Sequence, residues 1–529
     1  MFNRFPLFRK WVPEWLMKVI MFMQLLPSIV IFFLPLANVN AAAGYYGSEP
    51  LDIQFSVALF YSGYVGFYVL ERRFFSYLAA KEYFLLFTCL NMGTMFICYI
   101  TNDLYVFFFI RFIQGMLFSS IVNLSLSVLF TRLKSERARE ISFSIFFGFL
   151  ICALPFNNLV TADLIDAFDF NIVYKFALYA YIPGTILLNL SMNNIRLDKK
   201  FPLKRLDWQS FALYSMILIL IGYVLIFGQE FYWFSDLRIR YSVVAIALLI
   251  FIYYVRQKSM KRPYIDLSVL RYKNFLLGLL LLFILYICRF ASGISNTYFL
   301  TVLKLDHIHL SYINSFNMAG LIMGTFLSCI FILQKFSIRF ILILGFASLL
   351  FFYLSMFYIF TPESNENNFY LPLFLQGFGV GMLMVPIILF AITSVPVTAG
   401  AAASALCLAT RFISFCASIA ILNFYELYSK GYHYSAFQDK ITADNPVVKG
   451  MLRIQTNKLI AHGMDRAQAL KGAEKTLVTN LNHQTHIRFG MDYFEIMAWL
   501  ILVTIIVIAF FPYINRTVVQ LKSKDLAPA

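Results

Sequence analysis

Apolar residues fall in runs of about 20 along most of the chain, and short polar segments separate the runs. A helix needs roughly 20 apolar residues to cross a hydrocarbon core, and it satisfies its own backbone hydrogen bonds there. The pattern therefore predicts an all-α integral membrane protein with fourteen transmembrane helices. The predicted spans cover residues 16–37, 53–70, 84–101, 104–130, 141–162, 171–191, 208–229, 239–256, 275–299, 311–333, 339–360, 369–394, 399–427 and 491–511.

Composition and charge agree with this pattern. Of 529 residues, 60% are hydrophobic and 13% are charged, which is outside the range of soluble domains. The net charge of +16 does not indicate nucleic-acid binding, because most Lys and Arg lie in the two tails and in one alternate set of short loops. Basic loops stay on the cytoplasmic side. We predict a multi-pass protein of the cell membrane, specifically a bacterial inner membrane, with both termini cytoplasmic and the lipid bilayer as its surroundings.

The first predicted span also resembles a signal peptide, since Arg4, Arg9 and Lys10 precede its apolar run and "NAAAG" follows it. We favour a retained helix, because the run reaches about 20 residues and its loss would leave thirteen spans.

An internal sequence repeat, called the echo below, relates two distant parts of the chain. "FIRFIQGMLFSSIVNLSLSVLF" aligns without gaps to "LPLFLQGFGVGMLMVPIILFAI", so Gln114–Gly115 falls on Gln376–Gly377. In the same comparison Gly63 and Gly66 correspond to Gly320 and Gly324. The echo predicts a six-helix bundle at 1–200, two inserted helices at 201–262 and a second six-helix bundle at 263–529. Small residues permit close helix contact in lipid, so the pairs serve packing, line a central cleft, or both.

One long polar segment, at about 428–490, interrupts the second bundle. Asn445 and Pro446 suit a helix start, Gly463 suits a stop, and Asp465 can cap a second helix. We predict an outer helical hairpin whose second helix turns Ala467, Leu470, Ala473 and Leu477 toward the membrane. It covers the cleft or meets a partner protein. His483 and His486 have too few neighbouring ligand types for a metal site, and we expect no metal and no cofactor.

Three arginines, Arg111, Arg289 and Arg411, lie inside predicted spans without an acidic residue at the same depth. Each costs at least roughly 2.5–3.5 kcal/mol, so each should face a cavity or a polar partner. Two interpretations stay open. Backbone carbonyls and asparagines satisfy them, or the cleft is electropositive and attracts anionic or amphiphilic substrates. The candidate cavity residues are Asn123, Asn157, Asn158, Asn296, Asn317, Tyr286 and Tyr298.

Proton-driven transport needs a group that changes its protonation state, and no histidine lies in a predicted span. The candidates for coupling are Glu230, Asp492 and Glu495, near the outer ends of spans. Glu71, Arg72 and Arg73 are candidates for an inner gate. Facilitated diffusion without coupling is the alternative.

"RFIQG" at 111–115 and "AAASALCLATRFISFCASIA" at 401–420 resemble the major facilitator superfamily, specifically its fourteen-helix multidrug-export branch of the EmrB/QacA type. The resemblance implies the major facilitator fold, with Arg111, Gln114, Gly115 and Arg411 at motif positions. It also implies export of small amphiphilic drugs or metabolites by alternating access, together with a periplasmic adaptor and an outer-membrane duct. The chain departs from the pattern in span 1, where Leu26 and Ile31 stand at positions usually held by aspartate and asparagine.

A multispanning membrane enzyme, such as a glycan polymerase or an acyltransferase, is the alternative function. Such an enzyme needs a carboxylate or histidine set where its substrate meets the membrane. The long outer segment offers no recognisable arrangement of this kind. We therefore predict a transporter of a small-molecule substrate.

Overall fold

The structure, a computed structural model, describes residues 7–75, 77–132, 138–196, 206–260, 263–442, 444–511 and 514. It is all-helical apart from one isolated bridge between Phe8 and Met192. Its helices are α1 Glu14–Ala37, α2 Val39–Tyr46, α3 Pro50–Phe75, α4 Ala80–Ile100, α5 Leu104–Arg132, α6 Ala138–Ala167, α7 Ile172–Ser191, α8 Trp208–Phe227, η2 Trp233–Ser235, α9 Leu237–Ser259, η3 Leu267–Arg271, α10 Lys273–Arg289, α11 Ser292–Thr301, α12 His307–Leu333, α13 Ile338–Ile359, α14 Asn367–Thr393, η4 Val397–Ala399, α15 Gly400–Gln438, α16 Pro446–Ala461 and α17 Arg466–Phe510.

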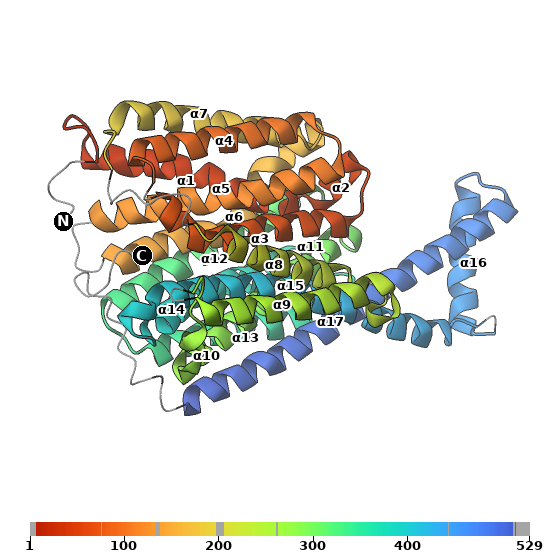
Figure 1. The fold of residues 1–529 in the computed structure, drawn as a ribbon. Helices are drawn as coiled ribbons and strands as arrows, with labels where there is room; N and C mark the ends of the chain where they lie inside the picture. Colours follow the sequence, from red (N-terminus) through yellow and green to blue (C-terminus); the bar gives the residue numbers. More distant parts are fainter. Residues whose placement is uncertain are drawn as a thin grey trace.

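Most helices lie side by side along one common direction (Figure 1). Within the described residues, 13 helices or helix pairs are long and apolar enough to cross a membrane. They coincide with thirteen of the fourteen predicted spans. The remaining run forms α7, which contains Lys175 and packs along α1 and α4. The all-helical membrane fold is therefore confirmed, and the count of fourteen spans stays a prediction.

Two groups of helices pack mainly within themselves. In the first group α3 packs on α5, α4 on α7, and α1 on α6 and α7. In the second group α14 packs on α12, α13 and α10, and α17 packs on α13 and α15. The groups meet through α6 against α12 and through α3 against α15, and α8 packs on both α3 and α15. Any cavity between the groups must therefore lie along these contacts.

The echoed glycines make the same contact in each group. A Cβ placed on Gly115 would overlap the carbonyl oxygen of Phe60, three residues before Gly63 in α3. A Cβ on Gly377 would likewise overlap the carbonyl oxygen of Asn317, three residues before Gly320 in α12. The reciprocal overlaps, from Gly63 and Gly320, also match. Backbone-to-backbone approach at these points therefore requires glycine.

The second pair of echoed glycines is not equivalent, and this part of the alignment is wrong. Gly324 faces α14, where a Cβ would overlap the carbonyl oxygen of Phe378. Gly66 instead faces the inserted helix α8 at Ser215, and its carbonyl accepts a hydrogen bond from the Tyr264 hydroxyl at 2.8 Å. The reason is spacing, since Gly66 follows Gly63 by three residues whereas Gly324 follows Gly320 by four.

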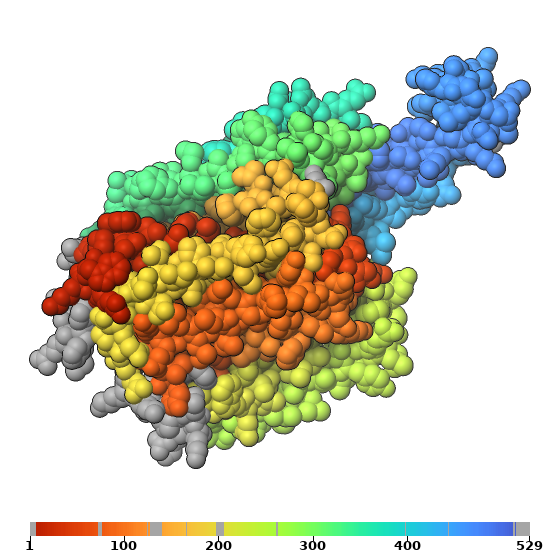
Figure 2. Space-filling view, turned by 90° about the horizontal axis from the view of Figure 1, so that it is seen from above, coloured from red at the N-terminus to blue at the C-terminus, as the bar shows by residue number. Residues whose placement is uncertain are grey.

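The outer hairpin forms as an arm that extends beyond the helix bundle (Figures 1 and 2). The Asn445 side chain accepts a hydrogen bond from the backbone N–H of Val447 and caps α16, with Pro446 at its first position. Gly463 adopts φ 88°, and Asp465 caps α17. These predicted caps are confirmed. The arm is longer than a separate hairpin, because α15 continues to Gln438 and α17 runs unbroken for 45 residues.

The buried face of the arm differs from the predicted one. Ala469 and Ala473 are buried, whereas Leu470 is 46% exposed and Ala467 is exposed. In the described part of the chain, the helix that packs on this section of α17 is α16. The arm therefore buries the α17 face that meets α16.

The glycine contacts yield a test of packing with a matched control. We expect Gly115→Ala and Gly377→Ala to lower the thermal unfolding midpoint in detergent, at a cost of about 1–3 kcal/mol each, because the helices must move apart. Gly93, in α4, has no atom within 4 Å of an added Cβ. Gly93→Ala should leave the midpoint unchanged or raise it. Equal effects at all three positions would contradict the close-contact account.

Candidate functional site

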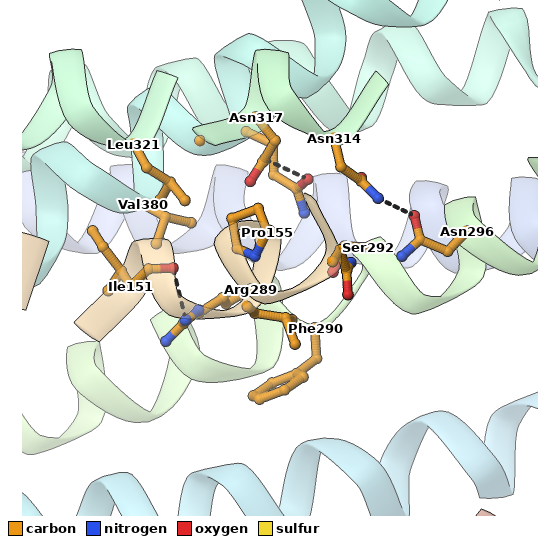
Figure 3. Close-up of a pocket in the computed structure, with 14 residues that line it drawn as sticks. Ile151, Pro155, Arg289, Phe290, Ser292, Asn296, Asn314, Asn317, Leu321 and Val380 are labelled. Atoms are coloured by element: carbon orange, nitrogen blue, oxygen red, sulfur yellow. Dashed lines mark hydrogen bonds between the residues drawn. The ribbon is translucent and has the colours of Figure 1, made fainter. Parts of the chain in front are cut away.

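A small polar cavity lies where α6 meets the second group of helices (Figure 3). Its volume is about 40 Å³, which leaves room for only a few water molecules. The polar residues that line it are Asn158, Arg289, Ser292, Asn296, Asn314, Asn317 and Gln376. None of the residues lining it within the described ranges is acidic.

Helix contacts close the cavity on both sides. Toward the outer end, the Ser311 hydroxyl of α12 donates to the carbonyl of Asn158 in α6 at 3.1 Å. Toward the inner end, a Cβ on Gly148 of α6 would lie 3.2 Å from a methyl of Thr325 in α12. A drug-sized pocket has a volume of roughly 300–1,000 Å³, so α6 and α12 must separate before a ligand of that size can enter.

The side chain of Arg289 extends from α10 to α6 at this cavity. Its Nη2 donates to the carbonyl of Ile151 at 3.1 Å. Pro155, four residues later, has no N–H, so that carbonyl has no donor from its own helix. The guanidinium also lies 5.7 Å from the centre of the Phe33 ring. Its Nη1 is buried and has no hydrogen-bond partner in the described residues.

Side-chain amides surround the remaining space. Asn314 donates to the Asn296 side chain at 3.2 Å, and this bond leaves the Asn296 amide nitrogen available (Figure 3). Asn317 donates to the carbonyl of Leu373 and to Gln376 Oε1. The Oδ1 atom of Asn158 is buried without a partner. The cavity is consequently rich in hydrogen-bond donors.

Arg411 lies beside this cavity, on α15. Its Nε donates to the Tyr286 hydroxyl at 2.8 Å, and its guanidinium stacks over Phe147 at 5.1 Å. Tyr61 of α3 packs against Phe412, the next residue of α15. Arg411 thus ties α15 to α10 and α6 with aromatic partners and without a carboxylate partner among the described residues.

Arg111 is fully buried inside the first group of helices. Its Nη1 donates to the carbonyl of Ile31 and to Gln114 Oε1, both at 3.0 Å, and its Nη2 donates to the carbonyl of Phe32 at 2.8 Å. Pro35 leaves the Ile31 carbonyl without a donor from its own helix. Arg111 and Arg289 therefore make the same kind of interaction: each guanidinium donates to a carbonyl that has lost its helical hydrogen-bond donor to a proline.

Comparisons with known proteins agree with this architecture. No protein-family model matches the chain. The multidrug export protein EmrB of Escherichia coli K12 is 22% identical over 382 residues, which cover 70% of this chain and 71% of that protein. The colistin resistance protein EmrB of Acinetobacter baumannii is 21% identical over 359 residues, or 66% and 68% of the two chains.

Solved structures give the same fold over nearly the whole length. A variant of the peptide transporter POT superposes with a TM-score of 0.58 at 13% identity, over 95% of both chains. A POT family transporter in complex with 5-aminolevulinic acid gives 0.58 at 12% identity, over 93% of this chain and 96% of that one. The chain has the major facilitator fold. The proteins it resembles include a multidrug export protein and a peptide transporter, which agrees with the prediction of a transporter.

The predicted cavity residues separate into two sets. Arg289, Asn158, Asn296, Asn317, Gln376 and Gly377 line the cavity. Tyr286 binds Arg411 instead, and the Tyr298 hydroxyl donates to the carbonyl of Thr361 at the outer end. Asn157 donates to the carbonyl of Val30 in α1. These three side chains bond away from the cavity, although the sequence places them at suitable depths, and the Oδ1 atom of Asn157 is buried without a partner in the described residues.

Asn123 belongs to the inner end rather than to the cavity. Its amide donates to Glu71 at 2.9 Å, and the Tyr83 hydroxyl donates to the other carboxylate oxygen at 2.8 Å. Glu71 is therefore buried in a hydrogen-bond network that joins α3, α4 and α5. The side chains of Arg72 and Arg73, the other proposed gate residues, lie outside the described part of the structure.

The three candidate coupling acids lie apart from the cavity. In the outer loop after α8, burial raises the pKa of Glu230, and the nearby Glu49 and Asp52 raise it further. Asp492 hydrogen-bonds with His433 Nε2 at 2.6 Å and accepts from the Ser429 hydroxyl. Glu495 is exposed on α17. Each would need a movement of its helix to reach the cavity.

Two residues that line the cavity, Ser292 and Asn314, were not predicted from the sequence. Ser292 lines the cavity because the span at Lys273–Thr301 breaks between α10 and α11, at Phe290 and Ala291. Asn314 precedes Asn317 by three residues, about one helical turn, so the polar face of α12 carries both. Helical spacing from Asn317 was the signal that identifies Asn314.

Arg111 and Pro35 can be tested as a pair. Arg111→Met leaves the Ile31 carbonyl unpaired, at a cost of roughly 1–3 kcal/mol, and also removes the bond to the Phe32 carbonyl. Pro35→Ala restores a backbone donor to Ile31, so the double variant should recover part of the lost stability in thermal unfolding. Pro27→Ala is the control. It changes another proline of α1, and Arg111 does not contact the carbonyl that this proline leaves without a donor. Equal recovery with Pro27→Ala would refute the pairing.

Proposed function

We propose that the protein exports small amphiphilic compounds, drugs or metabolites, by alternating access. The observation that carries this proposal is the small cavity that Arg289 and several side-chain amides line between α6 and the helices α10, α12 and α14. Transporters of this kind hold their substrate near the middle of the bilayer, between two bundles. The similarity to the two EmrB proteins supports export as the direction.

The moving parts of this mechanism are the predicted bundles, residues 1–200 and 263–529. The tight glycine contacts of Gly63 with Gly115 and of Gly320 with Gly377 support their treatment as rigid units. The inserted pair at 201–262 moves with the first bundle. Its helix α8 packs on α3, where Ser215 lies against Gly66, and Arg256 forms an ion pair with Asp207 at 2.8 Å, which ties α9 to the start of α8.

We place the protein in a bacterial inner membrane with both termini in the cytoplasm. The distribution of Lys and Arg supports this orientation. The beginning of α1 and the end of α17 lie at the end of the molecule opposite to the arm (Figure 1). The arm is then periplasmic.

Protons are the proposed driving force. Of the three candidate acids, Glu230 has the raised pKa that suits proton exchange on the outer side, because burial and two neighbouring carboxylates oppose its charge. Asp492 and Glu495 are retained as alternatives. The inner gate is assigned to Glu71, with its partners Tyr83 and Asn123.

The proposed partners are a periplasmic adaptor and an outer-membrane duct. The arm offers a docking face, since Val447, Met451 and Ile454 form a stripe on α16 that is 54–62% exposed. Lys449 and Arg453 flank this stripe. An amphipathic partner helix with acidic flanks fits both features.

Efflux from cells tests the proposed function. Cells that produce the protein should accumulate less of a fluorescent amphiphile, and Arg111→Ala should abolish this difference while the protein remains in the membrane. Arg271→Ala, at an exposed arginine at the end of η3, is the control and should export normally. Inverted vesicles with and without a pH gradient then separate proton-driven export from facilitated diffusion. Unchanged accumulation across a wide panel of amphiphiles would refute export.

Cross-linking in cells tests the partner. Met451→Asp combined with Ile454→Asp should reduce adaptor cross-linking at least about tenfold, because it charges the apolar stripe. Thr479→Asp places the same charge on an exposed position of α17 and should have no effect. Undiminished cross-linking by the α16 double variant would rule out this docking face.

A further inference from the structure

Arg289 is the one cationic group on the cavity wall, and its charge is not neutralised there. The residues that line the cavity include no carboxylate in the described part of the chain. Its bond to the Ile151 carbonyl at 3.1 Å uses one of its two terminal nitrogens. The other, Nη1, is buried without a partner. A buried guanidinium nitrogen without an acceptor is costly, so the site favours a ligand that brings one.

The side-chain amides around Arg289 offer further hydrogen-bond donors to a ligand. Asn314 and Asn296 satisfy one another through a single bond, which leaves the Asn296 amide N–H groups facing the space. Gln376 already accepts from Asn317 through its Oε1, so its amide nitrogen is the free end. Asn158 has a side-chain oxygen without a partner, but its amide can present nitrogen or oxygen to a ligand.

From this arrangement we infer that the cavity binds the anionic group of the substrate, a carboxylate or an anion of similar shape, on Arg289 with Asn296 and Gln376. A carboxylate accepts parallel hydrogen bonds from a guanidinium, and charge-assisted bonds of this kind are about twice as strong as neutral ones. The inference rests on the proposed transport function and specifies its substrate class.

The apolar part of the ligand has a place beside this group. Phe290, Leu154 and Val380 line the same cavity (Figure 3 labels two of them), and Arg411 with Tyr286 adds a second positive charge nearby. The small volume of the closed cavity holds little beyond the anionic group itself. The apolar part of the substrate therefore requires the separation of α6 from α12 that alternating access supplies.

The test uses three ligands that share one ring system: 2-naphthoate, 2-naphthamide and 2-naphthylmethylammonium. Their binding to the purified full-length protein is measured by calorimetry, and their transport is measured in proteoliposomes. The wild-type protein should bind the carboxylate at least about tenfold more tightly than the ammonium compound, since a hydrogen bond to a charged group contributes roughly 1.5–3 kcal/mol.

Substitutions then locate the preference. Arg289→Gln should weaken binding of the carboxylate at least about tenfold and leave binding of the amide within about twofold, which also shows that the variant is folded. Arg238→Gln removes an equal charge from the outer region and should change neither. Asn158→Asp provides an independent variant, because an acid in the cavity should neutralise Arg289 and abolish the preference for the carboxylate.

The outcomes separate the two proposals. A wild-type protein that binds the ammonium compound best, or an Arg289→Gln variant that keeps its preference for the carboxylate, overturns the anion site. Transport of the three compounds without any preference overturns the anion site and leaves export intact. Carboxylate binding that depends on Arg289, without transport of any compound, supports the site and counts against export.

Discussion

Every carbonyl oxygen inside a bilayer needs a donor, and the prolines of α1 and α6 each remove one. Water cannot supply the missing donor there, so a side chain must. Arg111 donates to Ile31 at the Pro35 kink, and Arg289 donates to Ile151 at the Pro155 kink. Each of these arginine charges, which is costly to bury in lipid, thus donates a hydrogen bond to a carbonyl oxygen that would otherwise be buried without one. The rest of the site follows from where these two bonds lie.

The two bonds have different consequences because they join different helices. The Arg111 bond lies within the first group of helices and fixes α5 against α1. The Arg289 bond joins α10 to α6, across the contact that alternating access has to open. Glycine contacts hold the helices within each group at backbone distance, whereas the contacts of α6 with α12 involve side chains and border the small cavity. Such a division favours movement between the groups over deformation within them.

Sequence patterns predicted the helices, the caps of the outer arm and the contact between echoed glycines, because each depends on local chemistry or on one repeated motif. They left open whether backbone carbonyls and asparagines satisfy the buried arginines or the cleft is electropositive, and they did not identify the carbonyls, since that depends on the register between α1 and α5 and between α6 and α10. The extension of α15 to Gln438 also escaped prediction, because its outer part lacks an apolar run. Asn123 shows the same limit, since depth alone did not distinguish the cavity from the inner gate.

The most direct test of the central claim is a disulfide between α6 and α12. A Cβ on Gly148 would lie 3.9 Å from the Cβ of Thr325, which suits a disulfide. In a background without the native cysteines, Gly148→Cys with Thr325→Cys should transport substrate when reduced, stop when oxidised and recover with reductant. Full transport by the completely cross-linked protein would contradict relative movement of the two groups of helices.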